Sequence, residues 1–317
     1  MTGYAFPISI RRVAAAALLA AAGAAQAQLS TDAERCASIT NNPELAIQHC
    51  TRAIDSGKFS GELLSRLHYN RAIELWARGM HDRAMADYDA AIRIDPKFGD
   101  AYYSRGNAWS MRGDSDRAIA DFDAALKLNP RDRQTLGSRA FEWTIKGDYA
   151  RAIADHDAVL QLDPKSAVTV FGRGRAHFYN GAWARAVADL EQAMKLDANP
   201  YTALWLYLAR KRGGADAENQ LDNETRDSRG GSWPGPVIVL FLGRTDPGSV
   251  MIASTDRNAT TQREQRCEAN FYIAHWHLLR GNRDQALPLL KEAQAECPKD
   301  ILEYEGAVAE LRRLQKP

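Results

Sequence analysis

Four cysteines are the residues of this sequence best able to do covalent or metal chemistry. They form two separated couples, Cys36 with Cys50 and Cys267 with Cys297. In an exported chain, an even number of cysteines is typical of disulfides. Zinc is the alternative, but neither a CxxC pair nor a His-x3-His pair accompanies them. We therefore predict two local disulfides and no metal site.

No motif of a familiar catalytic site is present. The sequence lacks HExxH, GxSxG, GxxxxGK[ST] and the Rossmann glycine pattern. One residue separates His275 from His277, which points their side chains to different faces of a helix. Acidic residues mostly fall at helical spacing, where a solvated face is the default. We expect no enzyme activity and no cofactor, although an active site in residues 213–260 stays open as the alternative.

A pattern of residues recurs every 34 positions through the middle of the chain. Glycine tolerates the positive φ that ends a helix, and proline cannot continue one, so each unit is expected to be a hairpin of two helices. Small residues let the two helices approach closely, while bulky residues fill the gap behind them. The recurring residues are Gly79, Gly113, Gly147 and Gly181; Ala84, Ala118, Ala152 and Ala186; Tyr88, Phe122, His156 and Leu190; and Pro96, Pro130 and Pro164.

This pattern resembles the tetratricopeptide repeat (TPR), over four consecutive units at residues 65–198. The resemblance implies an all-α fold, an α-solenoid of TPR helical hairpins with a C-terminal helical region. His156 departs from the usual aromatic and is expected to be a packed core residue. The predicted organisation is a signal peptide (1–27), an N-terminal capping helical hairpin (28–62), four TPR units (65–200), a degenerate repeat with short helices (201–260), and a TPR-like hairpin with a C-terminal capping helix (261–317).

The N-terminus has the order of residues found in an export signal. Arg11 and Arg12 precede an apolar run from Val13 to Ala25, and a small-x-small site ends at Ala27. The run is too short to cross a membrane, which takes roughly 20 residues, and no cysteine follows closely enough to be lipidated. We predict cleavage after Ala27 and a periplasmic protein of a Gram-negative bacterium without a transmembrane anchor. Whether the signal is of the general secretory or the twin-arginine type stays open.

The charge balance excludes one class of partner. The chain has 41 Lys and Arg against 40 Asp and Glu, and removing the two signal arginines leaves 39 against 40. Such a chain has no net field to hold phosphate backbones, so nucleic acid is not an expected partner.

An arginine and an aspartate also recur in every repeat. They form either an anion-binding ladder along one surface or a ladder of ion pairs between helices that fixes their stacking. Equal numbers of both signs favour the second interpretation. The residues are Arg71, Arg105, Arg139 and Arg173, with Asp87, Asp121, Asp155 and Asp189.

The C-terminal third departs from the repeat. The run 236–243 is β-like by composition, yet its proline and glycine suit a short buried helix equally. Asp246 and Pro247 begin another helix, and Pro288 is expected to kink a later one. Residues 301–315 are expected to form a last amphipathic helix that caps the array.

The TPR resemblance also implies a binding surface. Repeats of this class bind extended peptides on the concave face of their first helices, at the second, fifth, ninth, twelfth and thirteenth places. Here those places give an aromatic-lined trough with few charges, suited to a mostly apolar peptide or loop. Packing between repeats stays open as the alternative for each residue. The predicted contacts are Tyr69, Trp76, Tyr103, Asn107, Phe141, Phe171, Arg175 and Phe178.

The C-terminal third resembles the NlpI-type TPR lipoproteins of the Gram-negative outer membrane. The resemblance is carried by Phe241-Leu242-Gly243, Glu268 to Ile273, the hairpin from Gly281 to Ala293, and Glu305 to Leu311. It implies a scaffold of the cell envelope that binds protein partners, such as peptidoglycan hydrolases or a tail-specific protease. The missing lipidation cysteine puts membrane anchoring in doubt. A structural homodimer, paired through its terminal caps, is a further alternative.

Overall fold

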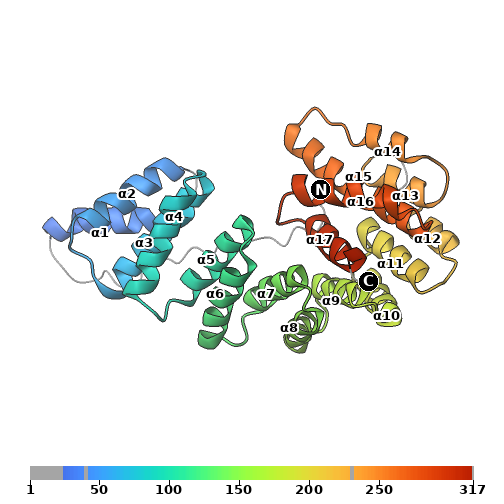
Figure 1. Cartoon of the computed structure of the whole chain (residues 1–317). Helices are drawn as coiled ribbons and strands as arrows, with labels where there is room; N and C mark the ends of the chain where they lie inside the picture. Colours follow the sequence, from blue (N-terminus) through green and yellow to red (C-terminus); the bar gives the residue numbers. More distant parts are fainter. Residues whose placement is uncertain (1–23, 39–41, 229–231, 316–317) are drawn as a thin grey trace. The chain divides into compact units, whose positions relative to one another are not determined.

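The computed structural model describes residues 24–38, 42–228 and 232–315, which form seventeen helices and no strand (Figure 1). The predicted signal peptide falls mostly on residues 1–23, outside this part of the chain. The helices are α1 (Ala24–Ser38), α2 (Pro43–Asp55), α3 (Gly61–Ala77), α4 (His81–Ile94), α5 (Gly99–Arg112), α6 (Ser115–Leu128), α7 (Arg133–Lys146), α8 (Tyr149–Leu162), α9 (Ala167–Tyr179), α10 (Trp183–Leu196), α11 (Pro200–Arg212), α12 (Glu218–Glu224), α13 (Gly235–Phe241), α14 (Pro247–Ala253), α15 (Ala259–Leu279), α16 (Arg283–Glu296) and α17 (Leu302–Gln315).

The helix boundaries follow the predicted signals. Gly113 ends α5 with φ of 81°, and the Asp114 side chain then accepts a hydrogen bond from the Arg117 N–H to begin α6. Asn42 caps α2 in the same way, through the Leu45 N–H, with Pro43 in the first turn. These local rules produce consecutive antiparallel pairs such as α3 with α4 and α5 with α6. The predicted all-α fold of TPR hairpins is confirmed.

The small and bulky positions of the repeat pack as expected. Ala84, Ala118, Ala152 and Ala186 are completely buried. A Cβ placed on Gly106 would lie 2.7 Å from the Phe122 ring, so the first helix of that hairpin touches the bulky residue of the second. His156 is likewise a buried packing residue, and burial lowers the pKa of its imidazole to about 3.

The described chain divides into two compact units, one ending at Thr135 and one beginning at Leu136. The N-terminal unit has cores around Leu67, Tyr69 and Phe122. The C-terminal unit is organised around a single large core that includes the completely buried Trp205 and Phe271.

The stretch outside the repeat pattern is helical and contributes to this core. The run for which strand and helix were both open is α13, and its residues Val237, Ile238 and Leu240 are completely buried. Asp246 caps α14 through the Ser249 N–H, as predicted. Pro288 lies inside α16, which continues on both sides of it.

The cysteines pair as the spacing predicts. Cys36 of α1 is joined to Cys50 of α2, and Cys267 of α15 to Cys297 at the end of α16. The second bond closes the α15–α16 hairpin just before the short connection that leads into α17.

Candidate protein-binding surfaces

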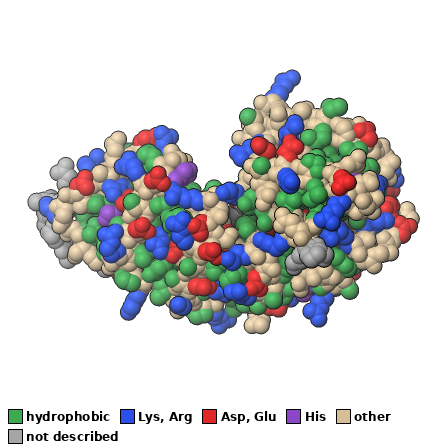
Figure 2. Space-filling view, in the orientation of Figure 1, with side chains coloured by type: hydrophobic (Ala, Val, Ile, Leu, Met, Phe, Trp, Pro, Cys, Tyr) green, Lys and Arg blue, Asp and Glu red, His purple; other side chains and the backbone are tan. Residues whose placement is uncertain are grey.

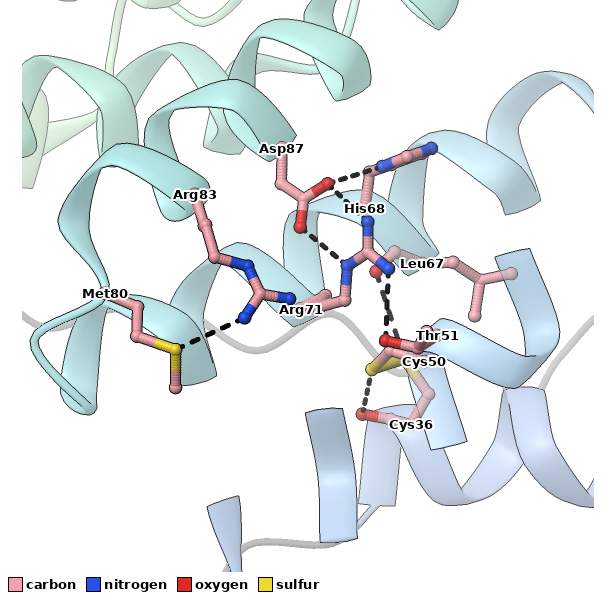
Figure 3. Close-up of polar contacts among 9 residues, drawn as sticks. All are labelled: Cys36, Cys50, Thr51, Leu67, His68, Arg71, Met80, Arg83 and Asp87. Carbon is pink, nitrogen blue, oxygen red and sulfur yellow. Dashed lines mark hydrogen bonds and ion pairs between the residues drawn. A yellow bond between two sulfur atoms is a disulfide. The ribbon is translucent and has the colours of Figure 1, made fainter. Parts of the chain in front are cut away.

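The recurring Arg–Asp pairs lie between helices and do not form an open anion site. In the first repeat, Arg71 donates to both carboxylate oxygens of Asp87, at 2.7 and 2.8 Å, and its third nitrogen donates to Thr51 of α2 (Figure 3). His68 contacts the same carboxylate at 2.8 Å. Burial alone would raise the pKa of Asp87, but the hydrogen bonds from Arg71 and His68 lower it below its usual value. The guanidinium therefore connects three helices.

Later repeats have the same arrangement, in which one arginine pairs with an aspartate of its own hairpin and also contacts the preceding hairpin. Arg105 holds Asp121 within its own hairpin and Asp89 of the preceding one, at 2.6 to 2.8 Å. Arg173 joins Asp189 and Asp157 in the same way. Both signs are also interspersed over the face of the molecule shown in Figure 2. The ion pairs thus set the register of neighbouring hairpins, which is the interpretation the sequence favoured.

Two of the four predicted contact residues in the N-terminal unit, Tyr69 and Tyr103, are buried packing residues. Tyr69 is completely buried between Tyr88 and Phe98, with ring centroids 6.1 and 4.8 Å away. Tyr103 is buried against Phe122. Tyr69 contacts its own hairpin and the start of the next one, whereas Tyr103 packs within its own hairpin, so neither lines an open trough in this structure.

Trp76 and Asn107 are placed differently. Trp76 is half-buried at the C-terminal end of α3. Asn107 of α5 is 4% exposed, and among the described residues its Nδ2 atom has no hydrogen-bond acceptor. Met111, one turn further along α5, is 40% exposed. Leaving a buried donor unpaired costs about 1–3 kcal/mol, so an acceptor supplied from outside would be stabilising here.

In the C-terminal unit the predicted face is covered by the chain itself. Phe171, Arg175 and Phe178 of α9 are at most 2% exposed, while Phe141 of α7 is half-buried. Phe178 packs edge-on against Trp183 and Trp205. Arg175 points to α17, the helix predicted only as an end cap. That helix packs against α9 and α15 as well as α16.

Four buried glutamates surround this contact, at positions where a solvated face was the expectation. Glu268 of α15 and Glu303, Glu305 and Glu310 of α17 are all 7% exposed or less. The solvated-face prediction is therefore wrong for them, because α17 brings its acidic residues against arginines and tyrosines of other helices.

Glu305 and Glu310 are paired with arginines. Arg175 lies 3.0 Å from a carboxylate oxygen of Glu305 and donates to the Leu302 carbonyl at 3.2 Å. Burial raises the pKa of Glu305 to about 6, against the opposing effect of Arg175. Glu310 accepts two hydrogen bonds from Arg313 and lies 3.5 Å from Arg212 of α11. Burial alone would raise its pKa, but the charges of Arg212 and Arg313 and the hydrogen bonds from Arg313 hold it below its usual value.

Glu268 and Glu303 form a pair of like charge. Trp233 donates its indole N–H to Glu268 at 2.7 Å, and the Tyr272 hydroxyl donates to Glu303 at 3.3 Å. Burial, together with the nearby Glu303, raises the pKa of Glu268 to about 8. Burial also raises the pKa of Glu303. Near neutral pH this site therefore holds a proton that the unfolded chain would release.

The sequence contained one signal for the placement of α17 that the prediction did not use. Gly306 lies inside the predicted helix, and a glycine inside a helical pattern often marks close packing. A Cβ at this position would lie 2.6 Å from both the Phe271 ring and the Tyr179 hydroxyl oxygen.

Within the described part of the chain, no three His, Cys, Asp or Glu side chains gather so as to hold a metal ion. Over the same residues, no helix combines the length and the apolar character needed to cross a membrane.

Comparisons with known proteins agree with this architecture. Residues 65–98 and 99–132 each match a family profile of the tetratricopeptide repeat. A TPR protein from Parabacteroides merdae has a similar structure, with a TM-score of 0.57, 14% identity, and coverage of 92% of this chain and 100% of that one. The C-terminal part of a TPR protein from Cytophaga hutchinsonii gives a TM-score of 0.52, 15% identity, and coverage of 89% and 97%. Tetratricopeptide repeats are therefore present, in a fold that such proteins share.

Proposed function

We propose that the protein is a periplasmic, non-catalytic TPR scaffold that binds protein partners through the N-terminal unit. The binding surface is the α3–α5 face, made by Trp76, Asn107 and Met111. The unpaired Nδ2 donor of Asn107 carries this assignment: the side chain is 4% exposed, so its neighbours must shift before a peptide carbonyl can reach the donor and pair with it. The half-buried Trp76 and the exposed Met111, which lies one turn beyond Asn107 on α5, supply the apolar contact area.

Two features support export to the periplasm. The charge, apolar run and cleavage site at residues 11–27 form an export signal, and the structure pairs all four cysteines. Expression of the full chain in a Gram-negative host, followed by fractionation and intact-mass measurement, tests this proposal. We expect a periplasmic product that begins at Gln28. A full-length product retained in the cytoplasm would contradict it.

The NlpI-type resemblance supplies the partners to test first. Purified peptidoglycan hydrolases and the tail-specific protease of the source organism are passed over the immobilised mature chain, and the dissociation constants are measured. We expect at least one to bind, and Asn107→Ala to weaken that binding roughly tenfold through loss of one buried hydrogen bond. Asn219→Ala, on the exposed surface of α12, is the matched control and leaves binding unchanged.

Equal binding by wild type and the Asn107 variant would contradict the assignment of the α3–α5 face. Two results would count against the scaffold itself. One is the absence of binding to every probe. The other is turnover of peptidoglycan or of a model peptide that co-purifies with the protein to homogeneity, since this would favour an active site in residues 213–260.

A further inference from the structure

The C-terminal helix α17 is enclosed in a way that a simple end cap is not. It lies against α9, α15 and α16 within the C-terminal unit (Figure 1). Nine of its residues are buried, and they include three glutamates and a glycine as well as apolar side chains. The buried residues are Leu302, Glu303, Glu305, Gly306, Ala307, Ala309, Glu310, Leu311 and Leu314.

The surface that receives the helix can be defined by five residues. The α17-binding face consists of Arg175, Tyr179, Arg212, Phe271 and Tyr272, from α9, α11 and α15. Its two arginines meet two glutamates of α17, and its aromatic rings leave space only for the glycine between them. An aromatic face with one buried cation, Arg175, and one half-buried cation, Arg212, is a recognition surface for an anionic helix.

These contacts contribute more to the selectivity of the face for a particular helix than to the stability of the bound state. A buried ion pair contributes little net stability compared with apolar packing, but loss of one partner is strongly unfavourable. If α17 only had to pack into a hydrophobic core, leucines at the glutamate positions would be sufficient. The arginine–glutamate matching therefore specifies which helix can occupy this face.

One contact works against permanent occupancy. Glu303 of α17 accepts a hydrogen bond from Tyr272, which lies one turn beyond Glu268 on α15, so that seating the helix adds a second buried carboxyl group to this part of α15. Tyr201 of α11 and Trp233 also face Glu268, and neither carries a compensating positive charge. Arg175 is the nearby cation, and it is already engaged by Glu305. Seating α17 therefore requires one of the two carboxyl groups to keep its proton near neutral pH, and release of the helix removes this cost.

We propose that the α17-binding face is a second protein-binding site, whose ligand is an acidic helix of the pattern Glu-x-Glu-Gly. The helix α17 is its resident ligand, and a partner helix with the same pattern takes its place. This site is separate from the α3–α5 face, so a failure of either proposal leaves the other standing.

The test keeps every residue of the protein. A recognition sequence for a site-specific protease is inserted between Asp300 and Ile301, in the connection that precedes α17. The folded, disulfide-intact protein is then cut. A fluorescent peptide of residues 301–315 is added, and its binding is followed by anisotropy.

We expect the peptide to exchange with the cut α17 and to bind one per chain. Glu305→Gln in the peptide, or Arg175→Met in the protein, should weaken binding by at least about tenfold. Gly306→Leu in the peptide should abolish it, because the added side chain meets Phe271 and Tyr179. Gln315→Ala alters the exposed end of the helix and is the matched control. Asn107→Ala in the protein leaves peptide binding unchanged.

Three outcomes would overturn the proposal. If the cut chain keeps its own α17 and takes up no peptide, the helix is a permanent core element. If cutting unfolds the C-terminal unit, as shown by circular dichroism, the conclusion is the same. If the Glu305→Gln peptide binds as tightly as the native one, the face does not recognise acidic helices.

Discussion

Gly306 is the residue at which α17 approaches its neighbours most closely. The ring of Phe271 and the hydroxyl of Tyr179 occupy the space that any β-carbon would need. Glycine inside a helix costs about 1 kcal/mol relative to alanine, so its presence here favours close packing over helix propensity. Because glycine has only a hydrogen atom in place of a β-carbon, the α17 backbone can lie close to Phe271 and Tyr179 in the C-terminal unit.

Gly306→Ala should therefore lower the free energy of unfolding by about 1–3 kcal/mol despite the better helix propensity of alanine, as overpacked cores do. Gly99→Ala is the matched control, since its β-carbon would approach Leu128 no closer than 3.8 Å. We expect the control to change stability by less than about 0.5 kcal/mol. Urea unfolding followed by tryptophan fluorescence measures both, and equal effects would contradict the close packing of α17.

The Arg–Asp ladder makes a second prediction at this scale. Arg105→Met leaves the buried Asp121 without its bidentate partner and should cost about 2–4 kcal/mol. Arg117→Met removes an arginine that is 60% exposed and paired with Asp114, and should cost under about 1 kcal/mol. A thermal melt of both variants measures the difference. Similar losses would mean that the ladder contributes no more than surface charge does.

The two residue-level patterns differed in how far the sequence could predict them. The Arg–Asp pairs recur with the repeat, so their spacing alone favoured ion pairs between helices. Whether Tyr69 or Phe178 would face solvent was open, because an aromatic residue on the first helix suits both a trough and a contact between hairpins. Glu305 was misassigned, since its burial depends on Arg175, which lies 130 positions away in the chain.

At the scale of the helix, local rules predicted the hairpins well. Gly113 and Asp114 mark a turn by their own backbone and side-chain chemistry, so the sequence predicted it without knowledge of the rest of the fold. Helix α17 shows the limit. Its sequence pattern predicted an amphipathic helix with one apolar face, but such a pattern does not indicate which other helices that face packs against. The surface it covers is set by tertiary packing.

The disulfides connect neighbouring helices, and this gives a test of pairing. Intact mass under non-reducing conditions should be about 4 Da below that of the reduced chain, since each bond removes two hydrogens. Non-reducing proteolysis should yield one peptide pair linked through Cys36 and Cys50, and another through Cys267 and Cys297. Crossed pairs, such as Cys50 with Cys267, would contradict the hairpin geometry.

At the scale of the whole molecule, the buried carboxyl groups make stability depend on pH. Glu268 keeps its proton in the folded chain up to about pH 8, whereas the unfolded chain releases it near pH 4.5. The folded state therefore binds more protons across this range, and its stability falls as pH rises. The buried His156 and His275 have the opposite effect, because their lowered pKa values destabilise the fold only below about pH 6.5.

Between pH 7 and pH 9 the histidines are neutral in both states, so Glu268 dominates. We expect the free energy of unfolding to fall by about 1 kcal/mol over this interval. Glu268→Gln should flatten the dependence, and Glu296→Gln, at an exposed position, should leave it intact. Urea titrations at pH 7, 8 and 9 measure it. A stability that rises with pH, or an unchanged slope in the Glu268 variant, would refute the assignment.

The Cys267–Cys297 bond fixes the chain immediately before the four residues 298–301 that lead into α17. Four residues reach at most about 14 Å, so a released α17 stays close to its binding face. Its effective concentration there is in the millimolar range or above. A free helix of equal intrinsic affinity competes with the tethered α17. To occupy half of the binding faces in the intact chain, the free helix must therefore be present at a concentration similar to the effective concentration of α17. Only a partner that binds more tightly than α17 can occupy this face at micromolar levels.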